Sequence, residues 1–183
     1  MHRIIFLDTE FTSFHRPYLL SLGMVSLDGA REFYAELDMT TPAGQEALGR
    51  SSEMVRGPAV LGQWGRVPGA NMDLHQMCKL TAQWLSNELA LATQDSGDAR
   101  IALCSDYDVD FKLLEELLRL DRSWDRFRNH IHYQGIYTLM SHVRADQAEE
   151  KCFEELTRTR GLRQHHALAD ALAMRAGFMA MNN

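Results

Sequence analysis

The most informative segment for the fold is Ile4-Ile5-Phe6-Leu7-Asp8-Thr9-Glu10-Phe11. Its four leading apolar residues stop abruptly at Asp8, which is typical of a short strand buried on both faces. Side chains alternate along a strand, so Asp8 and Glu10 should point to one side and Thr9 to the other. Two carboxylates this close repel each other at neutral pH, and a divalent cation can supply the counter-charge. The pair alone is a weak signal, because polar residues are common at strand ends.

The rest of the chain alternates between strand and helix patterns. Strand patterns recur at about 19–27, 31–37, 101–104 and, more weakly, 131–133. Apolar residues at helical spacing predict helices at about 72–92 and 108–120. A charged helix that ends at Gly161 is expected at 147–160, and a last helix at about 167–181. Asp28-Gly29 is a tight-turn dipeptide, so the first three strands should be antiparallel neighbours. This order predicts an α/β fold, a mixed sheet of antiparallel and parallel strands flanked by helices.

Between about 38 and 70 the periodic signals weaken, and glycines and prolines recur. We expect a long surface excursion there with one short helix near 45–55, and long loops are often functional. A chain of 183 residues can bury one full hydrophobic core but hardly two. Residues 1–183 are therefore expected to form a single domain.

Composition restricts the classes of function. The chain is 45% hydrophobic and 24% charged with a formal net charge of −6, so a broad basic surface for duplex nucleic acid is not expected. An acidic chain can still act on a few nucleotides, because cations neutralise a cluster of acids locally. Three widely spaced cysteines suggest reduced thiols and a cytoplasmic location, and no apolar run is long enough to cross a bilayer.

A second group of acids follows the strand pattern at 101–104. Asp106, Asp108 and Asp110 all lie near the expected start of the next helix. Any one of them could simply cap that helix with its carboxylate. The residues alone do not choose among the three.

A third group opens the last helix. His166 and Asp170 are four residues apart and share a helix face, so helical geometry favours that pair. His165 would have to lie on the preceding loop to reach the same place. Both histidines could also be ordinary loop residues.

Together these three groups resemble the motifs of the DEDDh exonucleases, which have the RNase H-like fold. Phe6-Leu7-Asp8-Thr9-Glu10-Phe11 is similar to the first motif, and Tyr107-Asp108-Val109-Asp110-Phe111 to the second. His165-His166-Ala167-Leu168-Ala169-Asp170 is similar to the third, H-x-A-x-x-D. The resemblance runs through nearly the whole chain except 38–70. The segment at 22–29 looks most like small bacterial 3′–5′ exoribonucleases related to a mycobacterial enzyme.

The resemblance implies Asp108 as the second-motif ligand and His165 as the general base. It departs at Ser105-Asp106, where many relatives have His-Asn. It also implies two Mg²⁺ or Mn²⁺ ions about 4 Å apart. Asp8, Glu10 and Asp170 would hold the first ion, and Asp8 would bridge to the second, which Asp108 supports partly through water.

The expected activity is hydrolysis of single-stranded RNA from its 3′ end to nucleoside 5′-monophosphates. Thr9 and Phe11 are expected to contact the terminal nucleotide, Phe11 by stacking on its base, although core packing explains Phe11 equally well. Relatives are often homodimers, and the helix at 72–92 or the final helix is a candidate face. The alternatives are a proofreading-like 3′–5′ DNA exonuclease, a non-catalytic nucleic-acid or protein-binding module that kept the fold, and a phosphatase or other metal hydrolase.

Overall fold

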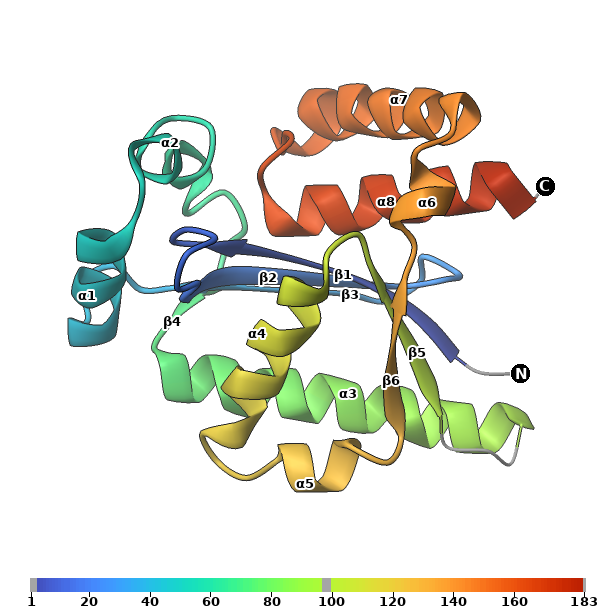
Figure 1. Cartoon of the computed structure of the whole chain (residues 1–183), viewed down its shortest axis with the longest axis horizontal. Helices are drawn as coiled ribbons and strands as arrows, with labels where there is room; N and C mark the ends of the chain where they lie inside the picture. Colours follow the sequence, from blue (N-terminus) through green and yellow to red (C-terminus); the bar gives the residue numbers. More distant parts are fainter. Residues whose placement is uncertain (1–2, 97–99, 183) are drawn as a thin grey trace.

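The computed structural model describes residues 3–96 and 100–182. In this part of the chain a six-stranded mixed sheet has the order β4-β3-β2-β1-β5-β6 (Figure 1). The strands are β1 (Arg3–Phe11), β2 (Leu19–Ser26), β3 (Glu32–Leu37), β4 (Asn71–Met72), β5 (Ile101–Ser105) and β6 (Ile131–Gly135). β2 is antiparallel to both its neighbours, whereas β5 is parallel to β1 and β6 to β5. The predicted mixed sheet of antiparallel and parallel strands is thereby confirmed.

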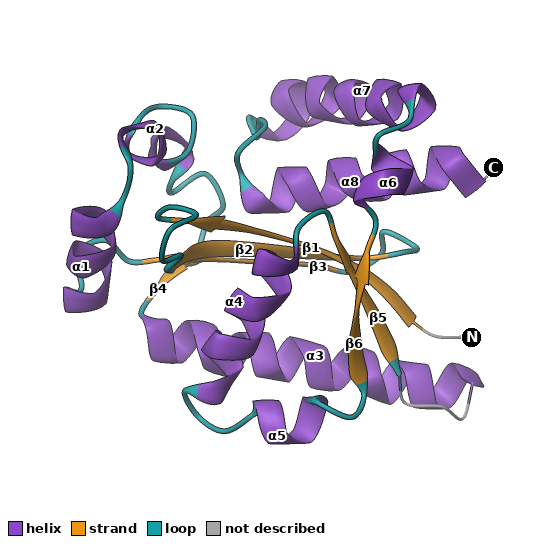
Figure 2. Ribbon diagram, viewed as in Figure 1, coloured by secondary structure: helices purple, strands orange, loops and turns teal. Residues whose placement is uncertain are grey.

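Helices cover both faces of this sheet, so the protein has three layers (Figure 2). One face carries α6 (Tyr137–Met140), α7 (Val143–Arg160) and α8 (Ala167–Asn182). The opposite face carries α3 (Leu74–Ser96), α4 (Asp108–Arg119) and α5 (Trp124–Phe127). α8 packs on β1 and β2, and α7 covers α8 from outside.

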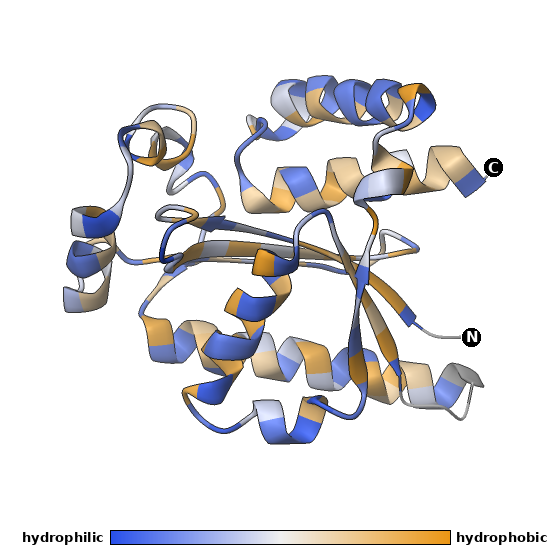
Figure 3. Ribbon diagram, viewed as in Figure 1, coloured by the Kyte–Doolittle hydropathy of each residue, from blue (hydrophilic) through white to orange (hydrophobic). Residues whose placement is uncertain are grey.

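The hydropathy of α7 and α8 explains why α8 lies next to the sheet and α7 lies outside it. α8 is largely apolar around its circumference, which suits a helix between a sheet and a second helix. α7 is mostly hydrophilic, as expected for a helix that faces solvent (Figure 3). The sequence of α8 thus places it against the sheet.

β1 contributes to the cores on both faces of the sheet. Ile5 and Leu7 belong to the core shared with α3 and α4, whereas Phe6 belongs to the core shared with α8. Because side chains alternate along a strand, Asp8 and Glu10 lie on the α8 side and Thr9 lies on the α4 side. One strand therefore presents polar groups to both helical layers at its carboxyl end.

Residues 38–70 form the crossover from β3 to the short parallel strand β4. They contain α1 (Pro42–Arg50), α2 (Glu53–Arg56) and the 3₁₀ helix η1 (Leu61–Gln63), so the single helix predicted near 45–55 was wrong. Ser51 is extended and ends α1, and the Ser52 hydroxyl accepts a hydrogen bond from the Val55 N–H to start α2. This serine pair divides one predicted helix into two.

Three further elements have no counterpart in the sequence prediction: β4, α5 and α6. Each spans two to four residues, which is too short for an apolar period to show. α7 also begins at Val143 and not near 147, because the His142 side chain accepts a hydrogen bond from the Arg144 N–H and caps it. Within the described ranges, none of the helices has the length and apolar character that a membrane crossing requires.

Candidate active site

Three acids from two distant segments meet at the carboxyl end of β1. Asp8 and Glu10 come from β1, and Asp170 comes from the first turns of α8. Each offers one carboxylate oxygen, and these oxygens all lie within 4.8 Å of one another. The side-chain alternation predicted for β1 therefore places both of its acids toward Asp170.

Gly23 lets α8 approach closely enough for this meeting. It lies directly opposite Asp8 in the β1–β2 ladder. A Cβ at position 23 would come within 2.4 Å of the backbone of Ala167, the first residue of α8. Since real Cβ atoms do not come that close to backbone, only glycine allows the helix to start on the sheet here. The glycine thus sets the distance between Asp8 and Asp170.

The electrostatics of the cluster favour a cation. Burial raises the pKa of Asp8 well above its usual value, and the carboxylates of Asp170, Asp110 and Glu10 raise it further. Burial, followed by the charge of Asp110, raises the pKa of Glu10 to about 7. Burial also raises the pKa of Asp170, although backbone hydrogen bonds from His165 and His166 partly oppose this. A divalent cation would remove the repulsion that raises these pKa values.

The structure places Asp110, and not the expected Asp108, in the pocket with the three acids. The Asp108 side chain is 64% exposed and pairs with Lys112, one helical turn further along α4. Asp110, by contrast, is 2% exposed and accepts a hydrogen bond of 2.6 Å from the Thr9 hydroxyl. Burial raises the pKa of Asp110 to about 7. The structure thus brings Asp110 to the cluster and leaves Asp108 outside it.

Two more acids lie at the rim of the same pocket. Asp106 has one buried carboxylate oxygen without a hydrogen-bond partner among the described residues, and burial raises its pKa. Glu149 of α7 faces the pocket too, and burial followed by the charge of Asp106 raises its pKa to about 7. Glu149 could not be predicted from the sequence, because an acid in a charged helix usually faces solvent.

The two histidines at the start of α8 have different surroundings. His165 lines the pocket, and its φ of 65° places it in the left-handed region, which non-glycine residues rarely adopt. His166 is 1% exposed and stacks on Tyr34, with ring centroids 4.3 Å apart. Burial lowers the pKa of His166 to about 4, so this ring stays neutral. The structure places His165 with the acids and His166 in the core.

Gln63 of η1 holds the loop that carries His165. Its side-chain amide donates hydrogen bonds to the carbonyl oxygens of Ala59 (2.7 Å) and Gln164 (2.8 Å). Its side-chain oxygen accepts a hydrogen bond of 3.0 Å from the Arg163 N–H. Gln63 is 1% exposed, so these bonds are shielded from water. The crossover at 38–70 therefore fixes the backbone immediately before His165.

Thr9 and Phe11 both line the pocket that contains the acids. The Thr9 hydroxyl is committed to Asp110, so a contact with a ligand would have to use the Thr9 backbone. Phe11 packs partly on the core and partly against Phe14, with ring centroids 5.0 Å apart. The pocket has a volume of about 470 Å³, within the range typical of small-molecule sites.

Comparisons with known proteins gave a match only among solved structures. No protein-family model matches it, and no curated protein matches it. A solved structure with some similarity is the nuclease domain of 3′hExo, described as a DEDDh family member bound to rAMP. The two chains are 14% identical with a TM-score of 0.49, over 99% of this chain and 92% of that one. A likeness at this level defines neither a family nor an activity, so function has to come from the site itself.

Proposed function

We propose that this chain is a metal-dependent 3′–5′ exoribonuclease that releases nucleoside 5′-monophosphates from single-stranded RNA. The observation that carries this proposal is the meeting of Asp8, Glu10 and Asp170, whose ligand oxygens lie within 4.8 Å of one another. A cluster of carboxylates with raised pKa values has no structural benefit by itself, and perturbed pKa values gather at functional sites. The motif resemblance of the sequence selects a nuclease among metal hydrolases.

The donor set fits hard divalent cations. Every side chain of the cluster offers carboxylate oxygen, which suits Mg²⁺ or Mn²⁺ better than zinc. Asp8, Glu10 and Asp170 would hold one ion, and Asp110 would support a second ion shared with Asp8. Two such ions at a phosphodiester activate water and stabilise the charge on the leaving oxygen.

His165 is the proposed general base. It lies beside the acids in the pocket, and histidine is the side chain that most often serves as a general base. Its Nδ1 or Nε2 would take the proton from the attacking water. His166 cannot share this role, because its ring is buried against Tyr34.

The size of the pocket supports action on chain ends. A volume of about 470 Å³ suits one terminal nucleotide better than a continuous strand. Phe11 on its wall would contact the terminal base, and the Thr9 backbone would lie near the terminal sugar. We propose that residues 1–183 act as one exonuclease domain.

A labelled-substrate assay tests the activity. With 5′-labelled single-stranded RNA and Mn²⁺ or Mg²⁺, we expect a ladder that shortens from the 3′ end. EDTA should abolish it, and His165→Ala should slow it by about 10²–10⁴-fold because base catalysis contributes that much. His75→Ala is the matched control, since His75 is exposed on α3 and distant from the site in the chain.

Several outcomes would contradict the proposal. Degradation that survives EDTA would exclude a metal-dependent site, and internal cuts would indicate another nuclease class. DNA of the same sequence should be assayed in parallel. A clear preference for DNA would favour the alternative, a proofreading-like 3′–5′ DNA exonuclease.

Cation binding should stabilise the fold more strongly as the pH rises. Burial raises the pKa of Glu10 from 4.5 and of Asp110 from 3.8, both to about 7. In the cation-free protein these groups therefore favour folding below about pH 4, and this contribution is lost as the pH rises through about 7. Cations compete with protons for the same oxygens. The rise in Tm caused by Mn²⁺, at a concentration on the order of 5 mM so that a weak site is occupied, should therefore be larger at pH 8 than at pH 5. An equal rise at both values would show that the cations bind elsewhere.

A further inference from the structure

Three exposed aromatic rings form a row that begins at the wall of the carboxylate pocket, where Phe14 and Tyr107 line it, and continues outside the pocket with Tyr137. Phe14, Tyr107 and Tyr137 are 77%, 54% and 58% exposed. The ring centroids of Phe14 and Tyr107 are 6.4 Å apart, and those of Tyr107 and Tyr137 are 6.0 Å apart. Phe14 also contacts Phe11 on the pocket wall. We call Phe14, Tyr107 and Tyr137 the aromatic row.

The topology of the sheet explains why these rings lie in line. β1, β5 and β6 are neighbouring parallel strands, so their carboxyl ends meet at one edge of the sheet. Phe14 follows β1, Tyr107 follows β5 and Tyr137 follows β6. The row therefore starts at the strand that carries Asp8 and Glu10 and runs toward the edge strand β6.

Exposure on this scale is unusual for aromatic side chains. Among the described residues, the large exposed hydrophobic side chains include three aromatic ones, and all three belong to the aromatic row. Isolated exposed apolar residues need no explanation, but a contiguous group next to a polar pocket indicates a binding surface. None of the three rings is needed to fill the core.

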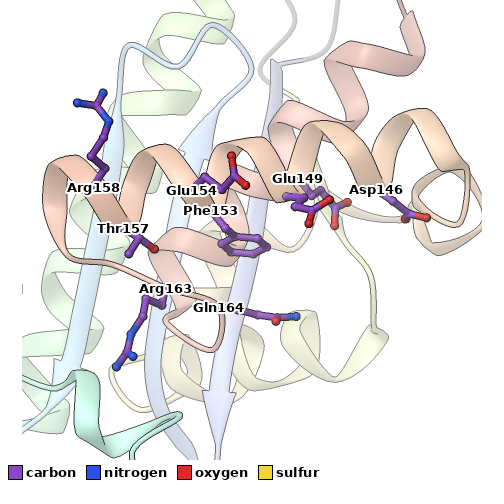
Figure 4. A pocket seen from close by; sticks show the side chains of 9 residues that line it. Asp146, Glu149, Phe153, Glu154, Thr157, Arg158, Arg163 and Gln164 are labelled. Carbon is purple, nitrogen blue, oxygen red and sulfur yellow. The ribbon is translucent and has the colours of Figure 1, made fainter.

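The other hollow next to the pocket is unsuitable for a nucleic-acid strand. It has a volume of about 730 Å³, runs along α7 and shares Glu149, Phe153 and Gln164 with the carboxylate pocket (Figure 4). Four carboxylates line this hollow, those of Asp146, Glu149, Glu150 and Glu154. Only two guanidinium groups, those of Arg158 and Arg163, line it with them. Its α7 wall would repel phosphates, whereas the aromatic row offers uncharged ring surfaces.

We propose that the aromatic row binds the bases of a single-stranded nucleic acid upstream of the terminal nucleotide. Each exposed ring can stack with one base, and this contact tolerates any base because every base has a π-face. A duplex keeps its bases paired and stacked inside, so it cannot make these contacts. The direction of the strand, with its 3′ end in the carboxylate pocket, rests on the proposed function.

A binding experiment tests the row without relying on turnover. Asp8→Asn serves as background so that substrate is not consumed, and anisotropy of a 5′-labelled single-stranded oligo(A) octamer measures affinity. Tyr137→Ala should weaken binding by about fivefold or more, the usual effect of losing one base–aromatic contact. Tyr137→Phe should bind like the parent because the ring remains, and Tyr137→Leu should bind like the alanine variant. Leu120→Ala is the control, an exposed apolar residue just beyond the C-terminal end of α4.

The same variant separates the row from the catalytic pocket during turnover. Tyr137 does not line the carboxylate pocket. In the otherwise native protein, Tyr137→Ala should therefore raise KM for the octamer about fivefold or more with little change in kcat. Hydrolysis of a dinucleotide should be unchanged in this variant, because a dinucleotide held in the pocket is too short to reach Tyr137. An octamer that lacks the third and fourth bases from its 3′ end should bind the parent protein at least as weakly as the intact octamer binds Tyr137→Ala, because it loses the bases for two rings. A DNA octamer should show the same loss in Tyr137→Ala, since stacking does not involve the sugar.

The outcomes distinguish this proposal from the proposed function. Unchanged octamer affinity in Tyr137→Ala, or equal affinity for duplex and single strand, would overturn the row while leaving an active exonuclease intact. A protein without any hydrolytic activity that still loses affinity in Tyr137→Ala would support the row and overturn the function. A change in molar mass in Tyr137→Ala by light scattering would show that the row is instead a contact between two copies.

Discussion

Asp8→Asn is expected to abolish hydrolysis and also to raise the Tm of the cation-free protein at pH 8. Asp8 lies between Glu10, Asp170 and Asp110, and all three raise its pKa. Both proposed cations would use Asp8 as a ligand, so the rate should fall by at least about 10³-fold, equivalent to several kcal/mol of transition-state stabilisation. The amide keeps the shape of the side chain but removes a buried charge that its neighbours repel.

The stabilisation should be visible by differential scanning fluorimetry in EDTA. About 1 kcal/mol corresponds to a shift of about 2–4 °C in a chain of this size. Mn²⁺ should raise the Tm of the native protein but not that of Asp8→Asn. Asp125→Asn, an exposed acid of α5, is the control and should change neither activity nor Tm. A lower Tm for Asp8→Asn in EDTA would mean that the carboxylate is needed for the fold and not for a cation.

Asp110→Asn is expected to reduce kcat about 10²-fold or more, whereas Asp108→Asn should leave it within about threefold of native. Asp110 is buried at the cluster and held by Thr9, and loss of a supporting carboxylate typically reduces the activity of a metal site by about 10–100-fold or more. Asp108 is exposed and paired with Lys112, and an exposed ion pair of this kind contributes little.

Single-turnover rates with a saturating 5′-labelled RNA octamer would measure this difference. Thr9→Val offers a further check, because it removes the hydroxyl that holds Asp110 while keeping the strand propensity of the residue. It should reduce the rate in the same direction as Asp110→Asn, but less. The assignment of Asp110 is wrong if Asp108→Asn proves to be the inactive variant.

The first and third motifs could be located from the sequence because their geometry is local. Strand alternation places Asp8 and Glu10 on one side of β1, and the abrupt end of the apolar run marks where the strand reaches the surface. The choice of His165 over His166 came from the resemblance, and the structure places His165 in the pocket and His166 in the core. The roles of these residues remain predictions.

The acid of the second motif that lies in the pocket could not be predicted from the sequence. Asp108 and Asp110 are two residues apart at the start of α4, which corresponds to a rotation of about 200° around the helix. Which of them faces β1 depends on how α4 packs, and in the structure the Thr9 hydroxyl meets Asp110. No local pattern contains that contact, since 101 positions separate the two residues. The relation to small bacterial exoribonucleases, the cytoplasmic location and the homodimer likewise remain predictions.

The contacts that support the site could not be predicted from the sequence either. Glu149 lies in a helix whose many charged residues predict exposure to solvent, and Gln63 lies in the segment predicted to be a surface excursion. Both matter because of what lies beside them in space. Gly23 carried a weak signal, a glycine inside a strand, which often marks a close approach of another backbone.

The three hydrogen bonds of Gln63 have a consequence for the evolution of this protein. They make the orientation of the proposed base dependent on a segment about 100 positions earlier in the chain. Changes in the loop at 161–166 and changes in η1 should therefore be selected jointly, even though neither segment carries an acid of the cluster. The loop also reaches its working shape during folding, so no entropy of loop ordering has to be spent when a substrate arrives.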